Sequence, residues 1–208
     1  MIVLDLFAGT KSVQRALDKL RLNYEYISLD NNPKFDTTYQ VDILEFDYRS
    51  LEIVPDIIWA SIPCLTWSKA TNAYRVLPDL IPKNKIAEEA NEQVYKTLEI
   101  IQYFLQRNPK LIFFIENPKG RLRHFPIMKS LHRYTIDYCQ YNETECEGKK
   151  IKKPTDIWSN LLTWRPKPLC KVKGHIRWDK GRGNKIERSK VPTNLIVSLL
   201  EKMLENQT

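Results

Sequence analysis

Short apolar runs alternate with helical patterns over the first two-thirds of the chain. Four apolar runs predict buried strands, at residues 2–7, 24–29, 56–60 and 111–115. Apolar residues at helical spacing predict one helix that begins near Ser12 and a longer one over about residues 85–107. Strands that alternate with helices are typical of a parallel sheet with crossover helices. We therefore expect an α/β fold with a doubly wound, mostly parallel sheet.

The last third of the chain carries a weaker pattern. Residues 134–139 resemble a strand, the structure of residues 156–162 is uncertain, and residues 163–190 look irregular. A closing helix is predicted from about Thr193, directly after Pro192. The sheet is thus expected to carry a small insertion before its last helix.

The positive charge is concentrated in this late region. The formal net charge is +8, yet residues 149–190 hold 14 Lys or Arg against 3 Asp or Glu, so the rest of the chain has a balance of −3. Trp158, Trp164, Trp178 and several glycines are interspersed among the cations. A solvated charged loop is the alternative, but cations mixed with aromatic residues favour a surface that contacts nucleic acid.

Length and composition suit one domain with a small appendage. We expect a main domain over residues 1–160, a basic segment over 161–190, and a helix over 191–208 that returns to the main domain. Four cysteines are too few for a disulfide framework, and neither a signal peptide nor a membrane-length apolar run is recognisable. We expect no membrane partner and a cytoplasmic location, or the interior of a host cell if the source is viral. The oligomeric state stays open.

The predicted strands end in residues that can do chemistry. A turn containing Gly9, the acid Asp30, the pair Pro63-Cys64 and the pair Glu116-Asn117 follow four strands. The carboxyl ends of parallel strands meet in one crevice, where ligands bind. The turn fits neither a P-loop nor a dinucleotide motif, because the required glycines are missing. A turn followed by a helix and by Asp30 favours a nucleoside cofactor without a pyrophosphate, although Asp30 alone is equally a turn residue.

Cys64 and Glu116 are the candidate reactive groups. A single cysteine is usually an inert small hydrophobe, whereas a nucleophile needs an exposed loop and an activated thiol. The loop after Pro63 meets the first condition, and Glu116 can supply acid–base chemistry from the neighbouring strand. The alternative for Glu116 is a carboxylate that caps a turn beside Pro118.

These motifs together resemble one enzyme family. The run Asp5-Leu-Phe-Ala-Gly9, the pair Pro63-Cys64 and the run Glu116-Asn117-Pro118 occur in the order found in cytosine carbon-5 DNA methyltransferases. The resemblance resumes at residues 139–141 and 153–158 and again at residues 191–194. It implies a Rossmann-like methyltransferase fold that uses S-adenosylmethionine, with residues 1–160 as the catalytic domain and residues 161–190 as the target-recognition segment.

The resemblance also implies roles for individual residues. Cys64 would attack carbon 6 of a cytosine taken out of its stack, and Glu116 would hold the ring at N3 and its amino group. The cofactor would lie against Phe7, Gly9, Asp30, Asp42 and Asn194. The target base or strand would contact Pro63, Asn117, Gln140 and one of two lysines, Lys152 or Lys153. Trp178, in the basic segment, is a further candidate for contact with the bases, and the equal alternative is that it anchors its loop to the core.

Some positions depart from the family pattern. Thr10-Lys11-Ser12 replaces a glycine-rich continuation of the first motif, and Asn142 and Thr144 stand where two arginines follow the glutamine. Lys152 or Lys153 would then bring the cation to the base. The short variable region, roughly residues 162–190, favours a short target, a helper subunit or little sequence choice. Two alternatives remain, a non-catalytic nucleic-acid-binding or regulatory relative of this fold and the same chemistry on RNA.

Cys139, Cys146, Cys170 and His175 raise the question of zinc. No paired C-x-x-C spacing occurs, and Cys139 falls in a predicted apolar strand. The sequence therefore predicts no metal site.

Overall fold

A six-stranded sheet forms the centre of the protein. The computed structural model describes all residues except 70–71, 142–144, 147–148, 178–185, 187–188 and 207–208. The sheet has the strand order β2-β1-β3-β6-β10-β7. Its strands are β1 (Ile2–Leu6), β2 (Glu25–Leu29), β3 (Ile57–Ser61), β6 (Ile112–Pro118), β7 (Arg133–Asp137) and β10 (Pro154–Ser159). The first four are parallel, whereas β10 runs antiparallel to both β6 and β7.

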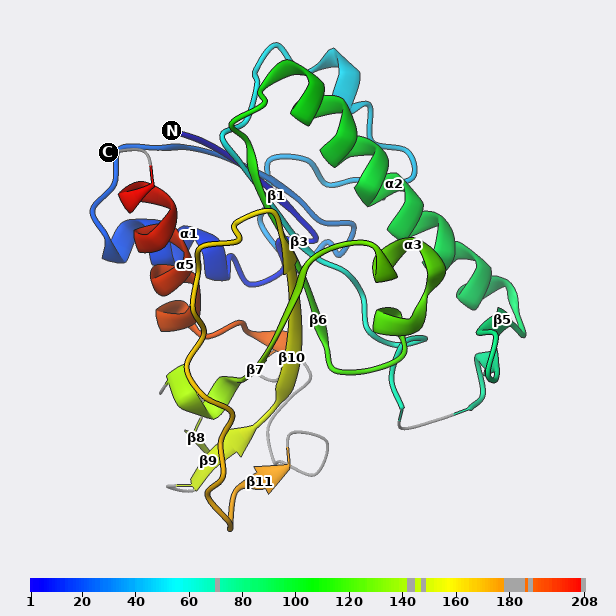
Figure 1. The fold of residues 1–208 in the computed structure, drawn as a ribbon. Coiled ribbons are helices and arrows are strands. Elements are labelled where there is room, and N and C mark those ends of the chain that lie inside the picture. The colour runs from blue at the N-terminus through cyan, green and yellow to red at the C-terminus, as the bar shows by residue number, and fades with distance from the viewer. Residues whose placement is uncertain (70–71, 142–144, 147–148, 178–185, 187–188, 207–208) are drawn as a thin grey trace.

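Helices cover both faces of this sheet (Figure 1). Helix α2 (Lys85–Arg107) lies on one face, and α1 (Ser12–Lys19) and α5 (Thr193–Glu205) lie together on the other. Each face has its own core: Val94, Ile101 and Phe104 of α2 belong to one buried cluster, and residues of α1 and α5 belong to a second. The short elements are η1 (Tyr48–Ser50), η2 (Leu122–His124), α3 (Pro126–Lys129) and η3 (Tyr138–Tyr141). The predicted doubly wound, mostly parallel α/β fold is confirmed.

The predicted elements of the first two-thirds are confirmed to within a few residues, with one exception. β6 does not stop at residue 115 but continues through Pro118, because β10 adds a second ladder that pairs Ile157 with Glu116 and Thr155 with Pro118. Glu116 therefore lies within a strand, which excludes the alternative that it is a turn carboxylate.

The strand predicted at residues 134–139 is confirmed as β7, but it ends at Asp137, so that Cys139 lies in the short helix η3. One prediction for the last third is wrong. Residues 163–190 are not irregular throughout, because β11 (Ile176–Arg177) is a strand that pairs with β9 (Lys149–Lys152). The uncertain stretch 156–162 contains most of β10, an interior strand of the main sheet.

A small second sheet adjoins the main one. It has the order β11-β9-β8, where β8 is Glu145–Cys146, and β9 leads through Lys153 directly into β10. In Figure 1 the small sheet extends beyond the end of the main sheet at which β6 finishes. The hairpin of β4 (Arg75–Val76) and β5 (Ile81–Pro82) lies between β3 and α2 in the chain.

The expected basic segment 161–190 is joined to the main domain by two kinds of contact. Leu161 and Trp164 are buried in the core beneath α1 and α5, and Trp164 stacks edge-on against Tyr134. β11, farther along, joins a strand that precedes residue 160. The division at residue 160 stays a prediction. None of the helices in the described part of the chain has the length and apolarity needed to cross a membrane.

Candidate functional site

The candidate groups lie along the carboxyl ends of the four parallel strands. The ends of β3 and β6 carry Cys64 and Glu116. Together with Tyr138, which follows β7, and Lys153, which precedes β10, we call them the thiol half of this edge. The ends of β1 and β2 form the glycine half, described below. Glu116 is paired with Ser61 across the parallel ladder, so the loop that carries Cys64 leaves β3 beside Glu116. The sequence prediction that these residues share one edge is therefore correct.

Glu116 is a buried carboxylate held by two groups from distant segments. The hydroxyl of Tyr138 donates to its Oε1 at 2.7 Å, and Nζ of Lys153 lies 4.0 Å from the same oxygen. Burial raises the pKa of Tyr138 well above its ordinary value, and the negative charge of Glu116 raises it further. Tyr138 therefore remains a neutral hydrogen-bond donor, and it leaves Oε2 of Glu116 to another partner.

The structure separates the two candidate lysines. Lys153 is buried, and its ammonium lies 4.8 Å from the centre of the Tyr138 ring as well as beside Glu116. Lys152 instead donates to the carbonyl oxygen of Cys170 at 2.8 Å and lies 3.5 Å from Asp137. Of the two, only Lys153 brings its charge to the thiol half.

The loop that carries Cys64 is anchored immediately after the thiol. Pro63 is exposed and Cys64 is half-buried, while Trp67 is fully buried and donates its backbone N–H to the Cys64 carbonyl at 3.2 Å. The guanidinium of Arg75 stacks on Trp67, 3.5 Å from the ring centre, and binds both the carbonyl and the hydroxyl of Thr66. Burial lowers the pKa of Arg75 to about 10, so it still carries its charge at neutral pH. This buried cation fixes the loop on which Cys64 sits.

The loops after β3 and β6 are also tied to each other. The amide nitrogen of Asn117 donates to the carbonyl of Ile62 at 2.8 Å. Beyond β6, the chain passes so close to Trp67 that a Cβ at Gly120 would lie 2.4 Å from its carbonyl oxygen. Only glycine fits there. Cys64 and Glu116 are therefore held in a fixed relation by contacts between their two loops.

The glycine half is built around a turn of unusual backbone conformation. Phe7, Gly9 and Lys11 all have positive φ angles, of 59°, 47° and 56°. The side chain of Asp30 holds this turn, since its Oδ2 accepts the Gly9 N–H at 2.9 Å and its Oδ1 accepts the Asn32 N–H at 2.9 Å. A non-glycine residue in the left-handed region is strained, and such strain gathers at functional sites.

Asp42 lies near Asp30 through a short chain of contacts. Its Oδ2 accepts a hydrogen bond from Asn31, the neighbour of Asp30, at 2.8 Å. The chain that leads to this acid pairs with the end of β2 through a single parallel bridge between Leu29 and Tyr39. Both carboxylates are half-buried and lie beyond the end of β2.

Asn194 lies in the first turn of α5. Its amide contacts Lys19, at the far end of α1, and the carbonyl of Tyr141. Val191 is the residue of this motif that reaches the glycine half, because its backbone N–H donates to Ser12 at the start of α1, at 3.2 Å.

Asp5 is a buried acid in the strand that leads into the turn. Its Oδ2 accepts a hydrogen bond from Tyr26 at 2.5 Å. Burial raises the pKa of Asp5 to about 7, and the hydrogen bond from Tyr26 opposes this shift. The carboxyl group is thus protonated in mildly acidic solution.

Gln140 is half-buried on η3, where its backbone carbonyl oxygen accepts from Lys167 at 3.2 Å, and Trp178 lies outside the described residues. Three important residues were not predicted. These are Tyr138, Gly120 and Arg75, which act through tertiary contacts: Tyr138 with Glu116, and Gly120 and Arg75 with Trp67. Tyr138 had one available signal, its position directly before the Cys139-Gln140-Tyr141 motif.

Comparison with known proteins gives a close relative and several distant ones. No family model matches the chain. A protein of Frog virus 3 (isolate Goorha), described as "Probable DNA (cytosine-5)-methyltransferase", is 30% identical over 230 residues, covering 97% of this chain and 99% of the relative. Among solved structures, the Dnmt2 methyltransferase of S. pombe has 14% identity and a TM-score of 0.44 over 86% of this chain and 53% of its own. A Spodoptera frugiperda DNMT2 mutant has 15% identity and a TM-score of 0.45 over 85% and 54%.

The chain thus spans about half the length of these two solved structures, but nearly the whole of its viral relative. The viral similarity extends across both halves of the edge, since it covers 97% of this chain and 99% of the relative. On this full-length similarity, the chain belongs to the cytosine-5 methyltransferase family.

Proposed function

We propose that this protein transfers a methyl group from S-adenosylmethionine to carbon 5 of cytosine in DNA, through a covalent adduct of Cys64. The observation that carries the proposal is the thiol half of the edge. There a half-buried thiol leaves its strand beside a buried carboxylate, and that carboxylate is held by a neutral donor and a cation.

The thiolate of Cys64 adds to carbon 6 of the flipped cytosine, and the electron pair of the ring double bond moves to carbon 5. Glu116 supports this step by giving a proton to ring N3 from the oxygen that Tyr138 leaves open. S-adenosylmethionine supplies the methyl group that carbon 5 then takes. Water then takes the proton from carbon 5, and the electron pair of that bond restores the ring double bond and expels the Cys64 thiolate. Ring N3 returns its proton to Glu116, and S-adenosylhomocysteine is the second product.

Lys153 and Tyr138 are the groups that replace the family's two arginines in this proposal. The Lys153 ammonium, 4.0 Å from Oε1 of Glu116, stabilises the negative charge that develops on the ring. Tyr138 fixes the orientation of the carboxylate. Both come from the segment between β7 and β10, whose backbone also joins them: the Tyr138 N–H donates to the Lys153 carbonyl at 3.2 Å.

The donors and acceptors of the glycine half fit the nucleoside part of S-adenosylmethionine. Each carboxylate oxygen of Asp30 accepts one backbone N–H, and each can accept another hydrogen bond, as from a ribose hydroxyl. Asp42 and the turn at Phe7 and Gly9 would complete the site. Asp30→Ala should weaken cofactor binding about tenfold, because it removes such a hydrogen bond and frees the turn. Isothermal titration with S-adenosylhomocysteine measures this, and Asp47→Ala, an exposed acid elsewhere, is the control.

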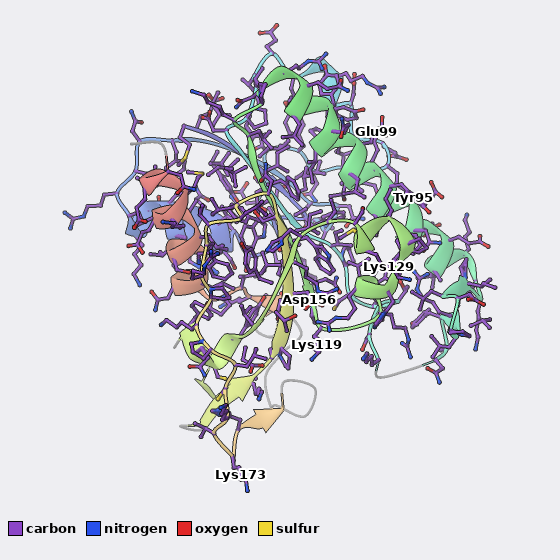
Figure 2. All side chains as sticks on the ribbon, in the orientation of Figure 1. Tyr95, Glu99, Lys119, Lys129, Asp156 and Lys173 are labelled. Carbon is purple, nitrogen blue, oxygen red and sulfur yellow. The ribbon has the colours of Figure 1, made fainter. Side chains whose placement is uncertain are left out.

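The late basic segment supports a nucleic-acid substrate. Lys171 and Lys173 are exposed, and Figure 2 shows Lys173 at the outer tip of the molecule near the small sheet. Each phosphate contact contributes about 0.9 to the slope of log affinity against log salt on duplex DNA. Alanine at both positions should flatten that slope, whereas Lys110→Ala, just before the opposite end of β6, should not. If the double variant has an unchanged slope, these lysines do not contact phosphates, and the segment is a solvated surface.

The decisive experiment is to incubate the protein with S-adenosylmethionine and either DNA or RNA, digest the product to nucleosides, and look for 5-methylcytosine. We expect it in DNA. Its appearance in RNA alone would establish the RNA alternative, and its absence from both, with cofactor bound, would establish the non-catalytic one.

Trapping tests the covalent step separately. DNA that contains 5-fluorocytosine should form a covalent complex with the protein, because fluorine blocks the final elimination. Cys64→Ser should lose both trapping and turnover but still bind the cofactor. Turnover that persists in Cys64→Ala would exclude the proposed mechanism.

A further inference from the structure

Three side chains outside the two halves form a compact set of metal-binding donors. The Sγ atoms of Cys139 and Cys170 and a ring nitrogen of His175 all lie within 4.8 Å of one another. Sγ of Cys170 and Nε2 of His175 are 3.0 Å apart. The spacing of these residues in the sequence predicts no metal site, but Cys139 lies in η3 and not in a strand.

The three residues come from segments that the fold brings together. Cys139 lies in η3, Cys170 in the loop that follows the main sheet, and His175 directly before β11. Both cysteines are buried, and His175 is half-buried. Both thiols are free and not joined in a disulfide.

The backbone of Cys170 is clamped on both sides. Its N–H donates to Asp137 at 2.9 Å, and its carbonyl accepts from Lys152 at 2.8 Å. Asp137 and Lys152 lie 3.5 Å apart, so the clamp is itself an ion pair. The donors around a metal are usually oriented by such outer contacts. Lys152, which does not reach the thiol half, instead orients the backbone of Cys170.

We propose that Cys139, Cys170 and His175 bind one zinc ion. Two thiolates and an imidazole form the donor set that zinc prefers. With Zn–S near 2.3 Å and Zn–N near 2.0–2.1 Å, tetrahedral ligand atoms lie about 3.5–3.8 Å apart. The observed spacing needs shifts of an ångström or less to reach this. Three ligands leave the fourth position to one further donor.

The site would stabilise the small sheet. β8 and β11 have two residues each and β9 has four, which is too little to form a core of its own. A metal held by Cys139 on the main domain and by His175 next to β11 would fix this sheet to the main one. The role is structural and does not depend on the proposed methyl transfer.

The test uses the full chain, purified without a metal-binding tag, loaded with excess zinc under reducing conditions and desalted. Elemental analysis should give about one zinc per chain. Replacement by Co²⁺ should produce the thiolate charge-transfer band and the intense visible bands of a tetrahedral ion. Cys170→Ser and His175→Ala should lose both signals. Cys64→Ser, which changes a thiol outside the cluster, should keep them.

Circular dichroism shows whether each variant is folded, and His175→Ala changes only a half-buried loop side chain. A folded native chain that takes up no zinc would overturn the proposal. So would metal retained by both Cys170→Ser and His175→Ala, or a disulfide between Cys139 and Cys170 in fresh protein under non-reducing mass spectrometry. None of these readouts requires methyltransferase activity.

Discussion

The two halves of the carboxyl edge are built by different means. In the thiol half, buried side chains hold one another, as Tyr138 and Lys153 hold Glu116. In the glycine half, half-buried carboxylates bind backbone N–H groups, as Asp30 binds those of Gly9 and Asn32. Side-chain identity therefore matters more in the first half, and backbone conformation matters more in the second.

This difference explains where the chain departs from its family. In the glycine half, Thr10-Lys11-Ser12 replaces a glycine-rich run, yet Lys11 still takes the left-handed conformation that glycine favours. In the thiol half, a lost cation cannot be replaced by backbone geometry. In the proposed function, Lys153 supplies that charge from a different position, next to the small sheet.

The sharpest test of the thiol half is Glu116→Gln. Glutamine keeps the shape and can still accept from Tyr138, but it cannot give a proton to the base. Methyl transfer should slow by about 10²–10⁴-fold, the range for general acid–base groups. Single-turnover kinetics at saturating cofactor and DNA measures this. If the native chain and the variant transfer the methyl group at equal rates, Glu116 takes no part in the reaction.

The glycine half contains a buried acid whose effect depends on pH. With a pKa of about 7 in the folded chain and an ordinary value near 4 when unfolded, Asp5 keeps its proton in the folded state alone across this range. The unfolded state then binds fewer protons, so the free energy of unfolding falls as pH rises from about 4 to 7. The loss should amount to a few kcal/mol, since each pKa unit is worth about 1.4 kcal/mol.

Asp5→Asn isolates this effect, because asparagine can accept the Tyr26 hydroxyl but does not titrate. Urea unfolding of both proteins at several pH values gives the difference curve. The native chain should lose stability relative to the variant between pH 4 and 7 and run parallel to it above pH 7. A flat difference would mean that Asp5 is already ionised in the folded protein at low pH.

The neighbouring lysines provide a matched pair for the thiol half. Lys153→Met should slow methyl transfer by about 10–100-fold, since a hydrogen bond or ion pair with a charged group is worth about 1.5–3 kcal/mol. Lys152→Met, which removes a charge from the clamp around Cys170, should change the rate far less. Rapid-quench rates and melting temperatures of both variants separate chemistry from stability. A larger rate loss in Lys152→Met would reverse the assignment.

The comparison also shows what could be predicted from the sequence. The strands and helices of the first two-thirds follow local periodicity, and the position of Cys64, Glu116 and Asp30 at one edge follows from the parallel sheet alone. The extension of β6 could not be predicted, because it depends on pairing with β10, about forty residues later in the chain.

The same reason explains the residues that were missed. Arg75 and Gly120 matter through their contacts with Trp67, and neither contact leaves a pattern in the local sequence. The cluster of Cys139, Cys170 and His175 has no paired spacing, since three separate segments form it. Long-range packing decides all of these positions.

The smallest expected effect tests whether the glycine half depends on backbone conformation alone. Lys11→Gly should raise the free energy of unfolding by up to about 1 kcal/mol, because glycine takes the left-handed conformation without strain. The variant also loses the ion pair between Lys11 and Asp36, but this reduces the gain in the free energy of unfolding only slightly, because Asp36 is fully exposed. Arg21, with a φ of 52° after α1, gives a matched control, and Arg21→Gly should change stability similarly.

Cofactor affinity should change by less than about threefold in both variants, because the Gly9 turn keeps its hydrogen bonds. Thermal unfolding and calorimetric titration measure the two quantities. If Lys11→Gly alone loses cofactor binding, the lysine side chain itself contacts the cofactor, and the glycine half depends on side-chain identity after all.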